Sequence, residues 1–154
     1  MALKENIDNL DKKILTLLIE NARMPFLEIA RACGVSGAAI HQRVQRLEEM
    51  DLIKGASLSI NVEKIGYQTC AYVGVFLEKG NLYEKVVDEL RKVPEIVECS
   101  YTTGNYAIFF KIYAFNNTHL KEVLNNKVQG IPGIASTETI IALEQSFIRN
   151  VPLY

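Results

Sequence analysis

Apolar residues recur every three to four positions in two segments near the N-terminus, which predicts two short helices there. The first covers about residues 7–21, with Asp8 or Asn9 as its cap and a buried stripe of Leu10, Ile14, Leu17 and Leu18. The second covers about residues 25–33 and buries Ile29, Ala30 and Cys33 together with Leu27 or Phe26. Pro25 suits the first position of that helix, because its missing N–H would be unpaired there.

A third helix is predicted over residues 36–48, directly after the short turn Gly34–Val35. Ser36 can cap it by accepting a hydrogen bond from a backbone N–H of the first turn. The apolar stripe of this helix is Ile40, Val44 and Leu47. Two helices joined by so short a Gly-containing turn make a helix-turn-helix. The opposite face is small at its start and then carries amides, a His and two Arg, which suits a DNA groove, although an ordinary surface helix has the same pattern.

The pattern changes after residue 50. Residues 52–60 alternate as a short strand that would serve as a wing or a return strand, and residues 61–66 read as a hinge. Beyond the hinge, strands are predicted over 67–78, 96–103, 106–114 and 134–143, with helices over about 81–92 and 116–128. A capping box at Asn81 and Glu84 is expected to start the first of these helices, and Asn116 or Asn117 to cap the second.

The predicted order of these elements is β-α-β-β-α-β, with a hairpin turn at Gly104–Asn105. Two such split βαβ units make the ferredoxin-like plan, in which helices cover one face of a four-stranded sheet. Residues 71–76 are apolar on both sides of the strand, so the other face is expected to meet the same domain of another subunit. The apolar tail 144–154 is expected to pack on a neighbouring strand or subunit.

Composition restricts the possible classes of protein. The net charge is −1, and residues 31–46 hold three Arg and one His without an acid, so any DNA-binding patch is small and an oligomer is needed to multiply its phosphate contacts. The three cysteines are far apart and read as reduced thiols of a cytoplasmic protein. There is no apolar run long enough to span a bilayer and no signal-peptide core. We therefore expect no membrane association.

Catalytic chemistry has little support in the sequence. His41 and His119 lie on different predicted domains, and neither a nucleophile setting, nor a metal-ligand spacing, nor a Gly-rich phosphate loop is present. We expect neither an enzyme, nor a metal site, nor a cofactor.

Several motifs resemble those of the Lrp/AsnC family, the feast/famine transcription regulators of bacteria. Residues 7–15, 21–23, 35–36 and 43–48 are similar to its DNA-binding domain, 53–55 and 65–67 to its hinge, and 101–106 and 136–139 to its effector domain. The motifs Tyr-Thr-Thr-Gly and Ser-Thr-Glu-Thr are most similar to those of the asparagine-responsive branch. Two positions depart from the family: Asp51 stands where Gly is frequent, and Asn105 where many members have Asp, whose charge can pair with an effector ammonium.

The resemblance implies an α+β protein with an N-terminal winged helix-turn-helix and a C-terminal ferredoxin-like βαββαβ domain. The corresponding division is a DNA-binding domain at 1–60, a hinge at 61–66, and an effector-binding and oligomerisation domain at 67–154. The resemblance also implies homodimers that pair through their sheets and assemble into octamers, with an amino-acid effector bound where dimers meet. The effector would lie near the loop after the second strand and the start of the last strand.

Candidate site residues follow from this reading. For double-stranded DNA they are Ser36, Ala38, His41, Gln42, Arg43, Gln45 and Arg46. Gln42 is the best base-reading candidate, since its amide can pair with N6 and N7 of adenine. We expect Arg46 on phosphate, His41 on phosphate or in solvent, and Arg43 either on DNA or in an ion pair with Glu20 or another acid.

The effector candidates surround the predicted hairpin and the start of the last strand. They are Tyr101, Thr102, Thr103, Gly104, Asn105, Tyr106, Gln129, Ser136 and Thr137. Backbone N–H groups around Gly104 can bind an α-carboxylate, and Gln129, Asn105 or Ser136 an amide side chain. Alternatively, the two tyrosines are cross-strand packing and the threonines form the turn.

The leading hypothesis is a sequence-specific transcription regulator that responds to asparagine or another amino acid. One alternative is a metabolic sensor subunit that uses the ferredoxin-like domain without binding DNA. Another is an architectural protein that compacts DNA with little sequence preference.

Overall fold

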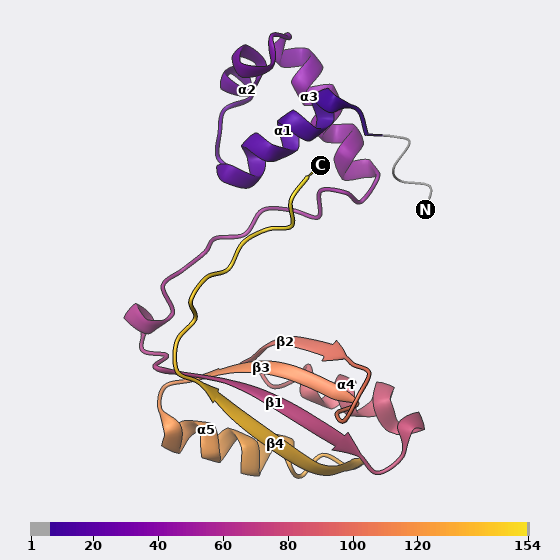
Figure 1. Ribbon diagram of the computed structural model, residues 1–154, viewed down its shortest axis with the longest axis vertical. Helices are drawn as coiled ribbons and strands as arrows, with labels where there is room; N and C mark the ends of the chain where they lie inside the picture. The colour runs from indigo at the N-terminus through magenta and orange to yellow at the C-terminus, as the bar shows by residue number, and fades with distance from the viewer. Residues whose placement is uncertain (1–6, 154) are drawn as a thin grey trace. The chain divides into compact units, whose positions relative to one another are not determined.

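The computed structural model describes residues 7–153, and in it the chain divides into two compact units (Figure 1). The first unit comprises the described residues up to Ser59 together with those from Phe147 onward, and the second comprises Ile60–Ser146. The apolar tail from Phe147 onward therefore groups with the helical unit rather than with the sheet that precedes it in the chain. The predicted division at 1–60, 61–66 and 67–154 stays a prediction.

The first unit contains three helices, α1 (Asn9–Glu20), α2 (Phe26–Cys33) and α3 (Gly37–Glu49). Of the two candidate caps, Asp8 caps α1, and the side chains of Asp8 and Asp11 each accept a hydrogen bond from the other's backbone N–H. Pro25 lies one position before α2, and Gly34 ends that helix with a φ of 70°. The predicted helix-turn-helix between α2 and α3 is confirmed.

A small apolar core joins the three helices. Its fully buried or nearly buried members are Ile14, Ile29, Ala30, Ile40 and Val44. They come from the stripes that face inward on each helix, so the packing of α3 leaves its polar side exposed.

The expected strand over residues 52–60 is not formed. Within residues 7–153 no strand is assigned before β1, and the side chains of Leu58 and Ile60 are exposed. A strand needs a hydrogen-bonded partner, and an alternating sequence by itself does not provide one. A 3-10 turn, Glu63–Ile65, follows and ends at Gly66 with a φ of 103°.

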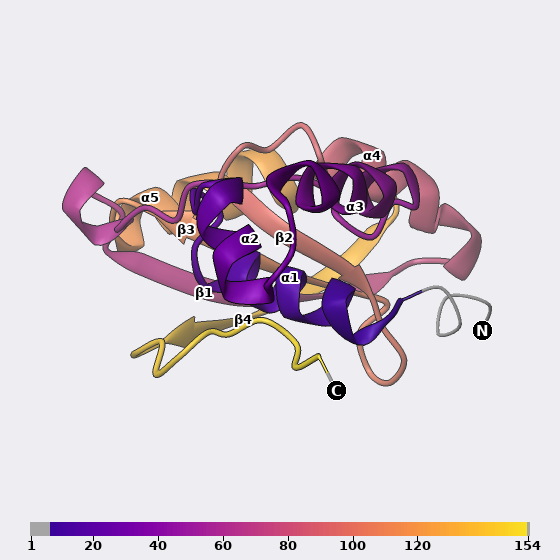
Figure 2. The same ribbon diagram turned by 90° about the horizontal axis from the view of Figure 1, so that it is seen from above.

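The second unit contains β1 (Thr69–Leu77), α4 (Tyr83–Leu90), β2 (Ile96–Tyr101), β3 (Ile108–Ala114), α5 (Asn117–Val123) and β4 (Ile134–Ala142). The strands form one sheet in the order β2-β3-β1-β4, and every neighbouring pair is antiparallel. Figures 1 and 2 show α4 and α5 on the same face of this sheet. The predicted βαββαβ order and ferredoxin-like plan are confirmed.

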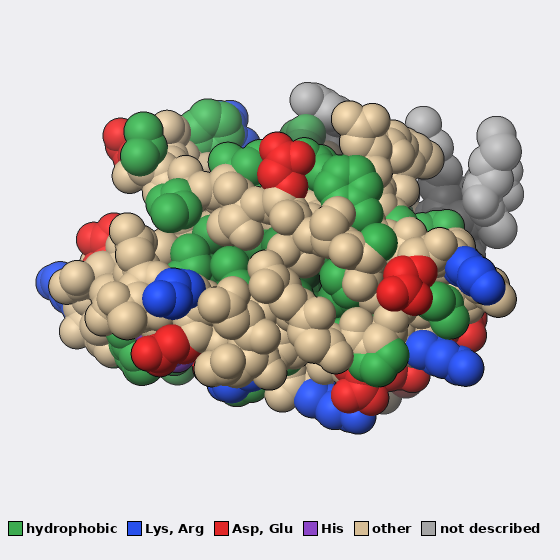
Figure 3. Space-filling model, turned by 90° about the horizontal axis from the view of Figure 1, so that it is seen from below, with side chains coloured by type: hydrophobic (Ala, Val, Ile, Leu, Met, Phe, Trp, Pro, Cys, Tyr) green, Lys and Arg blue, Asp and Glu red, His purple; other side chains and the backbone are tan. Residues whose placement is uncertain are grey.

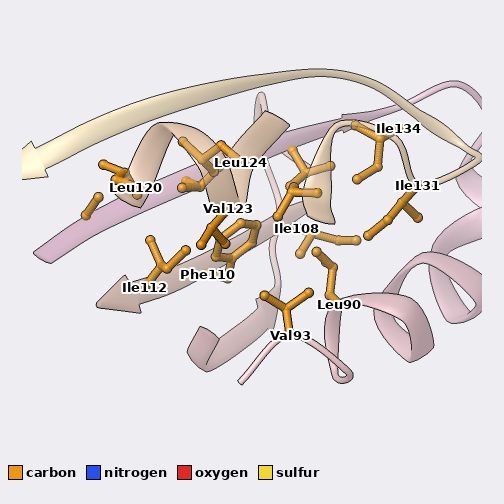
Figure 4. Close-up of a cluster of buried hydrophobic side chains, with 14 of the residues drawn as sticks. Leu90, Val93, Ile108, Phe110, Ile112, Leu120, Val123, Leu124, Ile131 and Ile134 are labelled. Atoms are coloured by element: carbon orange, nitrogen blue, oxygen red, sulfur yellow. The ribbon is translucent and has the colours of Figure 1, made fainter. Parts of the chain in front are cut away.

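The core of the second unit lies between the sheet and its two helices (Figure 4). It includes Phe110, Ile108 and Ile112 of β3, Leu90 of α4 and Val123 of α5. After α5 the chain continues as a π-helical turn, Leu124–Val128, closed by a hydrogen bond of 2.8 Å from the Gln129 N–H to the Leu124 carbonyl. Of the two candidate caps of α5, Asn116 accepts from the His119 N–H.

Two local predictions were wrong. Asn81 and Glu84 form no capping box, because the 3-10 turn Gly80–Leu82 runs directly into α4 and places Asn81 inside the turn. The β2–β3 hairpin has a loop from Thr102 to Ala107 rather than a two-residue turn, since β3 begins only at Ile108. Gly104 adopts a φ of 104° in that loop.

The other face of the sheet is aromatic, and neither α4 nor α5 covers it. Tyr72 of β1 stacks on Phe109 of β3 with ring centroids 5.9 Å apart. The Lys111 ammonium lies 5.8 Å from the Tyr72 ring and 5.1 Å from the Tyr113 ring. We call the surface formed by Tyr72, Phe76, Phe109, Lys111 and Tyr113 the open sheet face.

Candidate DNA-binding face and ligand depression

The polar side of α3 carries most of the predicted DNA-binding residues. Five of them, together with Ala39, line a shallow hollow of about 500 Å³: Ser36, Ala38, His41, Gln42 and Gln45. The Ser36 hydroxyl accepts a hydrogen bond of 3.2 Å from the Ala39 N–H, which caps the helix. The leading end of this face is small, as the sequence predicts.

The three larger side chains of this face differ in how they are held. The His41 ring lies 5.8 Å from the Phe26 ring of α2. Gln45 donates to Glu49 across one helical turn at 3.0 Å. The exposed Gln42 amide makes no hydrogen bond to the described residues. Gln42 is therefore the amide most available for contact with a base edge.

The two arginines of α3 turn toward α1. Arg43 Nη1 lies 2.7 Å from Asp8 and 2.9 Å from Asp11, and Arg46 Nη2 bonds to the other oxygen of Asp11. Arg43 is thus in a structural ion pair, with Asp8 and Asp11 as the partners rather than Glu20. Arg46, predicted on phosphate, also has an acidic partner in the chain.

The contacts between α1 and α3 shift the pKa of both Asp8 and Arg43. The backbone N–H of Asp11 and the Arg43 guanidinium lower the pKa of the Asp8 carboxyl. The hydrogen bonds to Asp8 and Asp11 raise the pKa of Arg43. Both groups are therefore held in their charged forms.

Asp11 is a residue to which the sequence argument assigned no role. Its side chain is 0% exposed, although Asp is almost never fully buried unless paired. The signal was present, because Asp11 lies three and four positions before the buried Ile14 and Leu15 and so stands inside an apolar stripe. An acid in such a stripe indicates a basic partner on a neighbouring element.

A second candidate site lies at the β2–β3 loop. A depression of about 330 Å³ is lined by five predicted effector residues, Tyr101, Thr102, Gly104, Asn105 and Tyr106, together with Phe76, Leu77, Gly80 and Ala107. Thr103 belongs to the same loop but not to the lining. The sequence argument did not include the β1 and Gly80 side of this depression.

Thr102 closes the loop. Its backbone N–H bonds to the Ala107 carbonyl at 3.1 Å, and its hydroxyl donates to the Tyr106 carbonyl at 2.9 Å. Its hydroxyl thus has a partner in the loop itself, which agrees with the alternative in which it forms the turn.

The two tyrosines lie on opposite sides of the sheet. Tyr101 packs against Tyr83 beside α4, with ring centroids 4.2 Å apart. The Tyr106 ring lies over the open sheet face, with its centroid 5.2 Å from that of Phe76 and 5.9 Å from that of Phe109. Its hydroxyl donates a hydrogen bond of 2.8 Å to Glu138. That hydrogen bond to Glu138 raises the pKa of Tyr106.

The three other effector candidates do not line the depression. Gln129 donates to Thr137 at 3.3 Å, next to the π-helical turn. Ser136 pairs with Phe76 across the β1–β4 ladder. The structure therefore brings the hairpin residues together but leaves Gln129, Ser136 and Thr137 as a neighbouring group within the chain.

Acidic and basic side chains alternate around exposed hydrophobic patches on the face shown in Figure 3. Within residues 7–153 there is no group of three His, Cys, Asp or Glu that could hold a metal ion. The helices in that part of the chain are too short or too polar to cross a membrane.

Two family models match the chain. The AsnC-type helix-turn-helix domain matches residues 7–48, and the Lrp/AsnC ligand binding domain matches residues 70–152. The chain belongs to the Lrp/AsnC family. The first match covers α1, α2 and all but the last residue of α3, and the second covers the sheet from the second residue of β1 onward with both of its helices.

Named Lrp/AsnC relatives extend over nearly the full chain. Regulatory protein AsnC of Haemophilus influenzae is 42% identical over 146 residues, which is 95% of this chain and 97% of that protein. HTH-type transcriptional regulator FL11 of Pyrococcus furiosus is 36% identical and covers 90% of both chains. The solved structure of Escherichia coli AsnC has a TM-score of 0.90 at 37% identity, covering 94% of this chain and 97% of that one.

A likeness of fold alone extends to a solved structure of lower sequence identity. A Neisseria meningitidis transcriptional regulator, solved in complex with L-methionine, has a TM-score of 0.90 at 19% identity, covering 95% of this chain and 96% of that one. The resemblance drawn from the sequence is confirmed. This Lrp/AsnC member is a transcription regulator with a helix-turn-helix DNA-binding domain and a ligand-binding domain.

Proposed function

We propose that this regulator reads specific double-stranded DNA with the polar face of α3 and responds to a small amino acid bound near the β2–β3 loop. The observation that carries the proposal is the hollow on α3, where exposed polar side chains follow a small leading end. A regulator that responds to effector binding needs no catalytic activity, and we propose that the chain is not an enzyme. Its DNA target also favours a cytoplasmic site of action.

In this proposal the side chains of α3 have different roles. Gln42 reads a base edge, because its amide is exposed and makes no bond to the described residues. Ser36, Ala38, His41 and Gln45 complete the groove surface. Arg46 contacts phosphate with the part of its guanidinium that Asp11 leaves available, and Arg43 supports the helix.

The effector proposal rests on the chemistry of the loop. Backbone N–H groups around Gly104 suit an α-carboxylate, and the aromatic and apolar lining suits a small side chain. Asn105 offers only a neutral carbonyl to an ammonium group, so the effector's identity does not follow from this residue. Asparagine and methionine are candidates because relatives are named AsnC and a structural neighbour was solved with L-methionine.

We further propose that the open sheet face pairs with a second copy and that dimers assemble into octamers. The aromatic side chains of this face are only partly buried, and Ile140, which pairs with Tyr72, is exposed; an apolar surface of this kind is typical of an interface. Near-neutral charge gives few phosphate contacts per subunit, so several copies of α3 are needed for tight binding. Such an assembly would include Gln129, Ser136 and Thr137 in the effector site if dimers meet there.

DNA binding is tested by fluorescence anisotropy on a duplex from the regulator's own upstream region and on a scrambled duplex of equal length. Gln42→Ala is expected to weaken discrimination between the two by about 5- to 100-fold, corresponding to one lost base contact. Gln45→Ala is the matched control, because that amide is bonded to Glu49, and a smaller loss is expected. Equal affinity of the wild type for both duplexes would favour the architectural alternative, and binding to neither would favour a metabolic sensor subunit.

The effector is tested by a thermal-shift screen of the twenty amino acids. A ligand that binds only the folded chain raises the melting temperature by mass action. A shift with one or a few amino acids supports the proposal. If none of the twenty shifts the melting temperature, the effector half of the proposal is wrong, while the DNA half is judged separately by anisotropy.

A further inference from the structure

Asp11 is a fully buried carboxylate that connects α1 to the DNA-reading helix. One of its oxygens accepts from Arg43 Nη1, and the other accepts from both the Asp8 N–H and Arg46 Nη2. The Asp11 side chain is 0% exposed, whereas those of Arg43 and Arg46 are 30% and 47% exposed. A buried acid thus holds two half-exposed cations at the edge of the candidate DNA-binding face.

The two arginines are held in different ways. Arg43 uses a single nitrogen for both Asp8 and Asp11, and lies between them at the surface of α1. Arg46 uses only Nη2, and a guanidinium has five N–H donors in a rigid planar fork. Because the fork is planar, holding one nitrogen on Asp11 restricts the directions in which the remaining donors of Arg46 can point.

We propose that Asp11 is a positioning residue for DNA binding, which aims the free edge of Arg46 at a backbone phosphate and fixes the rotation of α3 through Arg43. The proposal rests on the proposed role of the α3 face. Asp11 also weakens non-specific binding of the two arginines to DNA, since an arginine already paired with a carboxylate binds a misplaced phosphate less strongly. Asp11 would therefore increase sequence discrimination more than affinity for DNA in general.

Packing alone does not account for this arrangement. A buried ion pair is weak evidence for stability, because apolar residues of similar volume often serve as well or better. The side chains of Arg43 and Arg46 are moreover 30% and 47% exposed, which leaves them accessible to a phosphate while they stay bonded to Asp11. Phosphate contacts of this kind set the register in which the base-reading side chains act.

The test is the full-length Asp11→Asn variant, titrated against the upstream-region duplex and the scrambled duplex over a series of salt concentrations. Asparagine keeps the shape and one acceptor oxygen but removes the charge. We expect affinity for the specific duplex to fall by about 10- to 100-fold, the effect of one lost charge-assisted hydrogen bond. Affinity for the scrambled duplex is expected to stay constant or rise, and the salt slope not to decrease.

The matched control is Glu20→Gln, which makes the same change in charge at the other end of α1. It should leave discrimination between the two duplexes unchanged. If both variants raise or lower binding equally, net charge explains the effect and the proposal fails. If Asp11→Asn lowers affinity for both duplexes by the same factor, in proportion to the loss of folded protein, Asp11 is only structural and the proposal fails as well.

Two arginine variants test the proposal if the Asp11→Asn variant does not fold. Arg46→Gln should reduce the salt slope by about one per subunit, since it removes a phosphate contact. Arg43→Gln should leave the slope unchanged while weakening specific binding. Equal slopes for the two variants would overturn the proposal, whereas wild-type binding without any sequence preference would instead overturn the proposed function.

Discussion

The ring of Tyr106 lies directly across Gly74, so closely that a Cβ atom at position 74 would come within 2.4 Å of Tyr106 Cδ1. Gly74 pairs with Glu138 on the neighbouring strand β4, and the Tyr106 hydroxyl reaches that glutamate across the glycine. Tyr106 also lines the ligand depression. One side chain therefore belongs both to the open sheet face and to the candidate effector site.

Gly74→Ala is expected to displace the Tyr106 ring and lower the free energy of unfolding by about 1–3 kcal/mol, the usual effect of overpacking. Urea unfolding measures this change. Gly130→Ala is the matched control, because a Cβ atom there meets nothing within 4 Å. Equal stabilities of the two variants would show that the ring moves away without cost.

Glu138 should delay the ionisation of Tyr106 as pH rises. The pKa of Tyr106 lies above its ordinary value of 10.0 because of the hydrogen bond to Glu138, so this contribution to stability is complete below pH 10 and is lost as pH rises through the raised pKa. A tyrosinate absorbance titration of the wild type and of Tyr106→Phe isolates this group. In Glu138→Gln the same group should titrate earlier; a later or unchanged titration contradicts the assignment.

Lys127 should protect the second unit against acid. Burial alone would raise the pKa of Glu95, but the hydrogen bond from Lys127, 2.6 Å long, and the neighbouring charges hold it below its ordinary value of 4.5. The stabilisation is therefore present above pH 4.5 and is lost as pH falls through the lowered pKa of Glu95.

Lys127→Gln is expected to cost on the order of 1–2 kcal/mol at neutral pH, and to move the loss of stability to higher pH. Unfolding by urea at several pH values tests both parts. Lys121→Gln, which removes an equal charge from exposed α5, should do neither. The pair of variants separates the specific ion pair from general charge.

The side chain of Asp51, in the turn after α3, is expected to add little to the stability of the folded chain. Its φ is 55°, a left-handed conformation that glycine adopts freely and that Asp tolerates better than most residues. Asp51→Gly is expected to change stability by less than about 1 kcal/mol in either direction, and Asp51→Val to lower it by about 1–2 kcal/mol. A thermal melt of both variants checks this order, and a Val variant as stable as the Gly variant would contradict it.

Local sequence signals were enough for most elements of the fold. The stripe of Ile40, Val44 and Leu47 and the cap at Ser36 predicted α3, and Gly34 predicted the turn before it. Such features act within a few residues of one another, so they can be read along the chain. The failures were also local: the 3-10 turn at Gly80–Leu82 replaced the expected cap, and the alternation in 52–60 has no partner strand within residues 7–153.

By itself, then, the sequence determined the helix-turn-helix, the βαββαβ order, the family and the outward face of α3, because periodicity, caps and turns are properties of short segments. Only the tertiary structure decided where long side chains end. The sequence predicts Arg46 on phosphate and Arg43 either on DNA or in an ion pair, and the packing of α1 on α3 places both on Asp11. Likewise, the pairing of β1 with β4 placed Glu138 opposite Gly74, within reach of Tyr106. These partners are more than thirty residues apart in the chain, and only the packing of distant elements brings their charges and rings together.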